Sequence, residues 1–151
     1  MTDHDERVVP ASLAIPASAD IVFAALADPS RHPLWDGNDN LKFSSTGQRV
    51  QRVGDIFSTT LTGGSVRENH VVEFVESQVI AWMPAEPGQM PVGHVWRFTL
   101  APIDPNATLT THVYDWTNMF DESRYTRARA TTKDRLMASL MRLSEHVQEN
   151  Q

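Results

Sequence analysis

Short runs in which apolar and polar residues alternate fill the middle of the chain, from about residue 41 to residue 116. Alternation with a period of two is typical of half-buried β-strands, and these runs are rich in Val, Thr, Phe and Trp, which favour strands. Turn residues separate the runs, so the pattern predicts an antiparallel meander. The six expected strands span residues 41–45, 55–61, 66–75, 79–83, 93–101 and 108–116.

The segment before the meander predicts one strand and two short helical pieces. Apolar residues over 7–15 indicate a strand that a proline interrupts, as at a sheet edge or a bulge. Ser18 is the expected N-cap of a first helix over residues 20–27. Two prolines then limit residues 28–35 to about one further helical turn.

The apolar spacing becomes helical from Ser123 onward. One apolar stripe is expected to face the core, and it consists of Leu136, Leu140, Leu143 and Val147. The final helix either runs continuously from Ser123 or breaks before Lys133, where two threonines offer an internal cap.

Length and charge narrow the class of protein. A chain of 151 residues suits one domain, which we place at residues 7–148 between flexible ends at 1–6 and 149–151. The 13 Lys and Arg residues against 19 Asp and Glu give a net charge of −6, which leaves no basic surplus for binding nucleic acid.

Cysteine is absent and no metal-binding string occurs, so we expect neither a metal nor a cofactor. No apolar run is long enough for a membrane span, and we expect a cytoplasmic monomer or homodimer.

Several short strings mark successive elements of the chain. They are Ile15-Pro16-Ala17, Asp28-Pro29-Ser30-Arg31 followed by Trp35, Val53-Gly54-Asp55-Ile56-Phe57, Ile80-Ala81-Trp82 and Trp96-Arg97-Phe98. In this order they resemble the START-like (SRPBCC) superfamily, which includes polyketide cyclase- and dehydrase-like proteins, aromatase/cyclases, heat-shock ATPase activator-type domains and the birch-pollen allergen. The resemblance covers nearly the whole chain, and because the strings are scaffold motifs it implies a fold rather than one function.

The element order and the resemblance together predict an α+β helix-grip fold. About seven strands, in the order β-α-α-β6-α, form a curved antiparallel sheet wrapped around the long C-terminal helix. The resemblance implies a pocket between the sheet and that helix.

Two strands are expected to turn an aromatic face toward this pocket. On the strand over 93–101 the inward set is His94, Trp96, Phe98 and Leu100. On the strand over 108–116, Leu109 and Val113 compete for the inward face with a second set, and the large aromatics favour that second set, which is Thr110, His112, Tyr114 and Trp116.

A hairpin loop over residues 102–106 would set the register between these two strands. Trp96 would then lie opposite His112. His94 would lie opposite Tyr114, so both histidines would share one wall with the two aromatic side chains.

His94, His112 and Tyr114 are the candidate catalytic residues, because histidine titrates near neutrality and a phenol also exchanges protons. The residues expected to contact a ligand are Trp35, Phe57, Thr59, Trp82, His94, Trp96, Phe98, His112, Tyr114, Trp116, Leu136 and Leu140. Plain core packing is the alternative interpretation for each of them. Arg124, Arg127 and Arg129 suggest either a solvated start to the final helical region or a group that attracts a carboxylate at the pocket entrance.

Three functions are consistent with these expectations. The first is binding of a hydrophobic small molecule that is lipid-, polyketide- or aromatic-like, held mainly by apolar burial. The second is a polyketide cyclase- or dehydratase-type enzyme that uses the pocket histidines and tyrosine as acid and base. The third, implied by the resemblance alone, is a chaperone-associated interaction domain of the heat-shock ATPase activator type.

Overall fold

The computed structural model describes residues 6–149. Its elements in chain order are β1 (Val8–Ile15), α1 (Ala19–Ala27), η1 (Pro29–Arg31), α2 (His32–Trp35), β2 (Leu41–Phe43), β3 (Ile56–Leu61), β4 (Val66–Val75), β5 (Val79–Ala85), β6 (Val95–Asp104), β7 (Ala107–Asp115), η2 (Glu122–Arg124), α3 (Tyr125–Ala130) and α4 (Lys133–Glu149). This order confirms the predicted α+β arrangement of one strand, short helices, a six-strand meander and a long final helix. The expected flexible ends fall largely on residues 1–5 and 150–151, which lie outside the described residues.

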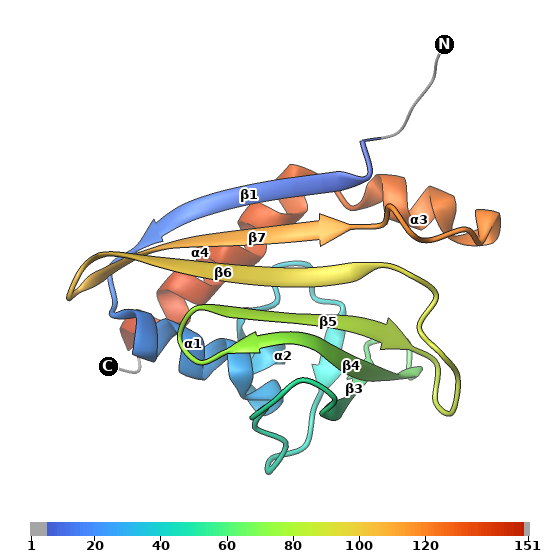
Figure 1. Ribbon diagram of the computed structural model, residues 1–151, viewed down its shortest axis with the longest axis horizontal. Helices are drawn as coiled ribbons and strands as arrows, with labels where there is room; N and C mark the ends of the chain where they lie inside the picture. Colours follow the sequence, from blue (N-terminus) through green and yellow to red (C-terminus); the bar gives the residue numbers. More distant parts are fainter. Residues whose placement is uncertain (1–5, 150–151) are drawn as a thin grey trace.

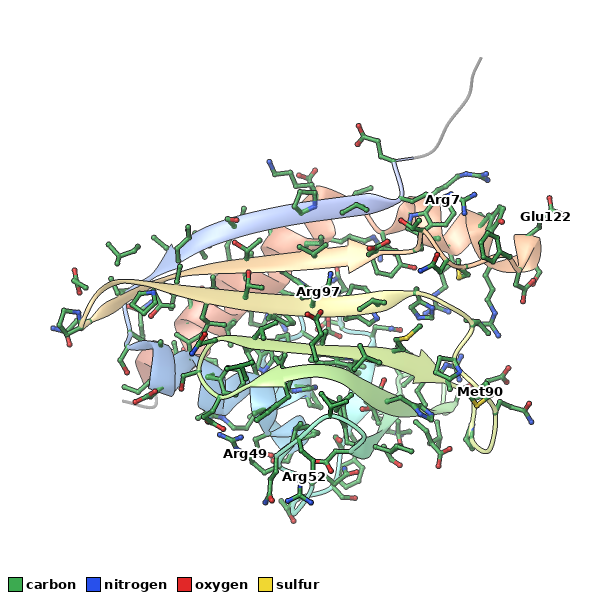
Figure 2. All side chains as sticks on the ribbon, in the orientation of Figure 1. Arg7, Arg49, Arg52, Met90, Arg97 and Glu122 are labelled. Carbon is green, nitrogen blue, oxygen red and sulfur yellow. The ribbon has the colours of Figure 1, made fainter. Side chains whose placement is uncertain are left out.

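The seven strands form one antiparallel sheet in the order β1-β7-β6-β5-β4-β3-β2. Figure 1 shows the sheet curving around α4, with α1 and α2 on the same face as α4. The opposite face carries charged side chains, among them Arg97, whose guanidinium forms an ion pair with Glu73 (Figure 2). The sheet therefore has one solvated face and one face that packs on helices, as expected of an antiparallel sheet.

Local sequence signals account for the helices that close the inner face. The Ser18 hydroxyl caps α1 by accepting a hydrogen bond from the Ile21 amide at 3.3 Å, and Asp20 lies in the first turn, where the helix dipole favours a negative charge. The Asp28 carboxylate then caps η1 through the Ser30 amide at 3.1 Å. Along α4 the predicted apolar stripe is buried, from Leu136 to Val147.

The final helical region breaks before Lys133, which is one of the two arrangements that the sequence left open. Thr131 has a non-helical backbone conformation, with φ −83° and ψ 84°, and ends α3. The Thr132 carbonyl accepts hydrogen bonds from the Arg135 amide at 3.0 Å and the Leu136 amide at 3.2 Å at the start of α4. The break lets α3 and α4 run in different directions (Figure 1).

The predicted register between the last two strands is wrong by two residues. Trp96 lies opposite Tyr114, and Phe98 lies opposite His112. The strands continue beyond the expected loop to a tighter turn, in which the Asn106 amide donates to the Asp104 carboxylate at 2.7 Å. A bulge between residues 102 and 104 absorbs one extra residue. Because the shift is an even number, every side chain keeps its predicted face.

The first residue of β6 also differs from the prediction. The strand begins at Val95 rather than Gly93, so His94 lies just before it. Gly93 has φ +122°, and an added Cβ there would meet the Asn118 carbonyl oxygen at 2.2 Å. The segment before β6 therefore packs directly against the backbone that follows β7.

Candidate functional site

A cavity of about 740 Å³ lies between the inner face of the sheet and the helices. Strands β3 to β7 supply one wall, and α2, α3, α4 and the loop over residues 36–41 supply the other. Cavities of this size accommodate drug-sized molecules, and their lining is usually apolar with a few polar groups. The lining here is more polar than that, because it combines an aromatic part with a part rich in arginine and other polar residues.

The aromatic part is a cluster centred on Trp82 of β5. Its indole stacks on the His32 ring with 5.2 Å between centroids and on the Phe98 ring at 5.9 Å. Phe57 meets Trp82 edge-on at 5.4 Å, and Trp35 meets Phe98 edge-on at 5.5 Å. All five side chains are buried, so this aromatic cluster forms a rigid apolar surface.

His32 belongs to this cluster although the sequence did not single it out. Its Nε2 lies 2.7 Å from the Leu26 carbonyl oxygen, and because a carbonyl only accepts, the proton must be on Nε2. Burial lowers the pKa of His32 to about 4, against partial compensation from the Leu26 carbonyl, so the ring is neutral at pH 7. Nδ1 is then an acceptor in the cavity wall. The only sequence signal was its place beside Pro33, in the short helical turn expected over residues 28–35.

His112 lies on β7 beside the aromatic cluster. Its ring stacks on Phe98 with 3.9 Å between centroids and an interplanar angle of 13°, and Trp96 lies 5.6 Å away. Burial lowers the pKa of His112 to about 3. The backbone of Leu136 lies close enough to the ring to raise this pKa slightly. Within residues 6–149, however, neither ring nitrogen forms a hydrogen bond of normal geometry. His112 is therefore a neutral, buried imidazole with unused hydrogen-bonding capacity.

His94 and Tyr114 lie near each other in the same wall, with ring centroids 5.9 Å apart. Burial lowers the pKa of His94 to about 4, and the guanidinium groups of Arg124, Arg67 and Arg127 lower it further. Burial raises the pKa of Tyr114 to about 12, against smaller opposing effects of the Thr131 hydroxyl and Arg127. Both groups are neutral at pH 7.

Most residues predicted to contact a ligand do line the cavity; the exceptions are Trp116 and Leu140. Trp116 follows the end of β7, where the Arg7 guanidinium covers its ring at 4.3 Å and Tyr125 packs 5.4 Å away. Leu140 is fully buried in the core beneath α4. Period-two and period-3.6 patterns identify the inward face of an element, but they do not say how far along it the cavity extends.

Many polar residues line the cavity that were not predicted from the sequence. These residues include Asp36, Asn38, Asp39, Asn40, Arg67, Asn69, Ser123, Arg135 and Ser139. Of the three arginines noted near the final helix, Arg124 and Arg127 line the cavity and Arg129 does not. Loop and helix residues of this kind carry no periodic signal that marks them as inward.

Neither a cluster of metal-binding side chains nor a membrane-spanning helix occurs in the part of the chain that the structure describes. Among residues 6–149, no group of three or more His, Asp or Glu side chains is arranged to hold a metal ion. Within the same range, no helix has the length and apolar character needed to cross a membrane.

Comparison with known proteins finds two curated relatives in Mycobacterium tuberculosis. The uncharacterized protein Rv0088 of strain H37Rv is 29% identical over 108 residues, which cover 70% of this chain and 46% of that protein. The uncharacterized protein MT0096 of strain CDC 1551 is 31% identical over 109 residues, with the same coverage. The chain thus spans about half the length of the curated relatives it matches. No family model matches the chain.

Solved structures give a consistent match over nearly the full length. Protein NE0264 from Nitrosomonas europaea has a TM-score of 0.72 at 15% identity and covers 98% of both chains. The Zhui aromatase/cyclase from a Streptomyces species has a TM-score of 0.67 at 16% identity, covering 94% of this chain and 93% of that one. The Aha1 dimer from Colwellia psychrerythraea has a TM-score of 0.66 at 20% identity, covering 93% and 95%.

These similarities, together with the curved sheet around α4, establish the architecture. The chain has the helix-grip fold shared by START-like and polyketide cyclase-like proteins.

Proposed function

We propose that this protein binds a hydrophobic small molecule in the cavity between the sheet and α4. The observation that carries the proposal is the cavity itself, with about 740 Å³ of space beside a buried aromatic cluster. A core that served stability alone would be packed to native density, because voids of this size forfeit dispersion contacts and hydrophobic burial.

The apolar walls are sufficient for useful affinity. A ligand that removes roughly 400 Å² of combined apolar surface from water gains about 10 kcal/mol. The loss of translational and rotational freedom costs at least about 4 kcal/mol. The remaining ~6 kcal/mol corresponds to a Kd on the order of 10–100 μM, before any polar contact is added.

The pKa shifts that burial causes in the cavity support binding over acid–base catalysis. A cyclase- or dehydratase-type enzyme would use His94, His112 or Tyr114, with pKa values matched to the working pH. Their pKa values of about 4, about 3 and about 12 lie far from neutrality in the ligand-free protein. As neutral groups, they are suited to orienting a ligand through hydrogen bonds.

The interaction-domain alternative has less support. A protein that acts through its surface has no need of a cavity of about 740 Å³, and the likeness to the Aha1 dimer is a likeness of fold at 20% identity. The cavity therefore favours a small-molecule ligand.

Native mass spectrometry of gently purified protein tests the proposal, followed by denaturing extraction of any bound molecule. We expect a stoichiometric apolar compound, or ligand-induced thermal stabilisation in a panel of hydrophobic compounds. The cavity variant Leu61→Trp, which adds bulk to a lining residue, should lose this binding. Ile56→Trp, on the exposed face of the same strand, is the matched control and should retain it. Absence of bound compound and of any stabilisation across the panel would refute the proposal.

A further inference from the structure

The charge of the cavity wall is opposite in sign to that of the whole chain. The chain carries a net charge of −6. Four arginines nevertheless line the cavity, and they are Arg67, Arg124, Arg127 and Arg135. Arg67 and Arg124 are half-buried and Arg127 and Arg135 are exposed, so the positive charge gathers along the open side of the cavity. Like charges gathered on one wall repel one another unless acidic groups compensate for them.

The two acidic residues of the lining do not provide that compensation. The Asp36 carboxylate accepts hydrogen bonds from the backbone amides of Asn38, Asn40 and Leu41 at 2.8–3.1 Å, so it organises its own loop. The Asp39 carboxylate pairs with Arg142, which is not part of the lining, at 3.3 Å.

Three of the four arginines lack an acidic partner within residues 6–149. Arg67 donates to the Val66 carbonyl at 3.0 Å, and Arg127 reaches the Asn40 side-chain oxygen at 3.5 Å. Neither of them, nor Arg135, forms an ion pair in this range. Arg124 differs, because its contacts with Asp121 at 3.1 Å and Glu86 at 3.3 Å fix its position.

Three of these side chains line the same cavity as His94, although they come from different elements. Arg67 lies on β4, Arg124 on η2 and Arg127 on α3, and all three lower the pKa of His94. Figure 1 shows α3 beyond the end of β7, whereas α2 lies behind the central strands. The arginine group and the aromatic cluster therefore belong to different parts of the same cavity.

We propose that the ligand is an apolar molecule with one carboxylate, which Arg67, Arg124 and Arg127 receive while the apolar body lies against the aromatic cluster. Guanidinium groups match carboxylates through paired N–H donors, and such charge-assisted hydrogen bonds are stronger than neutral ones. The neutral imidazole of His94 adds a donor or an acceptor beside them. This inference rests on the proposed function, since it names the class of molecule that the cavity takes.

Two matched ligand pairs test the inference: dodecanoate with methyl dodecanoate, and 2-naphthoate with methyl 2-naphthoate. Each pair differs only in the negative charge, and isothermal titration calorimetry gives the Kd of each compound. We expect at least one carboxylate to bind about tenfold more tightly than its ester, and this ratio to fall as the salt concentration rises.

Substitutions assign the preference to the arginines. Arg67→Gln and Arg127→Gln, alone and together, should bring the ratio of carboxylate to ester affinity close to one while ester binding persists. The matched control is Arg52→Gln, which removes the same charge from an exposed residue outside the lining (Figure 2). It should leave the ratio unchanged. Arg127 is exposed, so its single variant keeps the test valid if the double variant unfolds.

The outcomes separate the inference from the proposed function. Equal affinity for acid and ester in the unmodified protein, or a preference that survives the double substitution, would overturn the carboxylate proposal and leave apolar binding in place. Failure of both esters and both acids to bind would count against the proposed function itself.

Discussion

Three glycines allow the close backbone contacts around the cavity to be measured separately from backbone strain. Gly64 has φ +95° and open space where a Cβ would lie. At Gly37 a Cβ would meet the Ala138 carbonyl carbon of α4 at 2.4 Å. Gly93 combines φ +122° with a contact of 2.2 Å to the Asn118 carbonyl oxygen. Gly64→Ala therefore introduces backbone strain alone, Gly37→Ala introduces a steric clash alone, and Gly93→Ala introduces both.

The expected losses of unfolding free energy follow from these geometries. An L-residue in the left-handed region costs roughly 1–2 kcal/mol, and overpacking against a backbone that cannot yield costs roughly 1–3 kcal/mol. We therefore expect about 1 kcal/mol for Gly64→Ala, about 2 kcal/mol for Gly37→Ala and about 3–4 kcal/mol for Gly93→Ala. For a chain of this length, the last value corresponds to a fall in Tm of roughly 6–16 °C.

Urea denaturation followed by tryptophan fluorescence measures all three losses, with calorimetric melting as a second readout. Gly93→Ala should lower the unfolding free energy clearly more than Gly64→Ala, because only the added Cβ at residue 93 meets a backbone carbonyl. Equal losses at the two positions would show that the segment before β6 does not pack against the chain after β7 as closely as described.

Two further predictions concern the buried histidines and the faces of α4. Folding lowers the pKa of His32 to about 4 and that of His112 to about 3, from an ordinary value of about 6.5. Between these pKa values and pH 6.5, the unfolded chain therefore binds more protons than the folded protein does. The unfolding free energy should therefore be highest above pH 6.5 and should fall as the pH is lowered toward 4. Urea denaturation at a series of pH values measures this fall, and His112→Phe should make it less steep. An unchanged dependence on pH in the variant would contradict the prediction. Leu140→Ala should cost about 2–5 kcal/mol by leaving a cavity in the core, whereas Met141→Ala, 57% exposed on the same helix, should change stability by less than about 0.5 kcal/mol in the same assay. Similar losses for the two variants would show that the assignment of the faces of α4 is incorrect.

The inward faces of the strands were predictable because a period of two separates the two faces and the large aromatic side chains indicate which one is buried. Trp96 and Phe98 on β6, and His112 and Tyr114 on β7, line the cavity as predicted. Their pairing across the hairpin was not predictable, because it depends on where the turn forms. The turn at Asp104 and the bulge before it moved the register by two residues without changing a face.

The sequence by itself determined the order of the elements, the buried stripe of α4 and the aromatic character of the inner wall, because each is encoded in local periodicity. Tertiary structure alone decided where the cavity ends, leaving Trp116 and Leu140 in the core. It alone brought His32 to the aromatic cluster and Arg67 to the same place as Arg124 and Arg127. These residues are distant along the chain and lie on elements of different period, so their proximity depends on sheet curvature and on the break before α4, which no local pattern specifies.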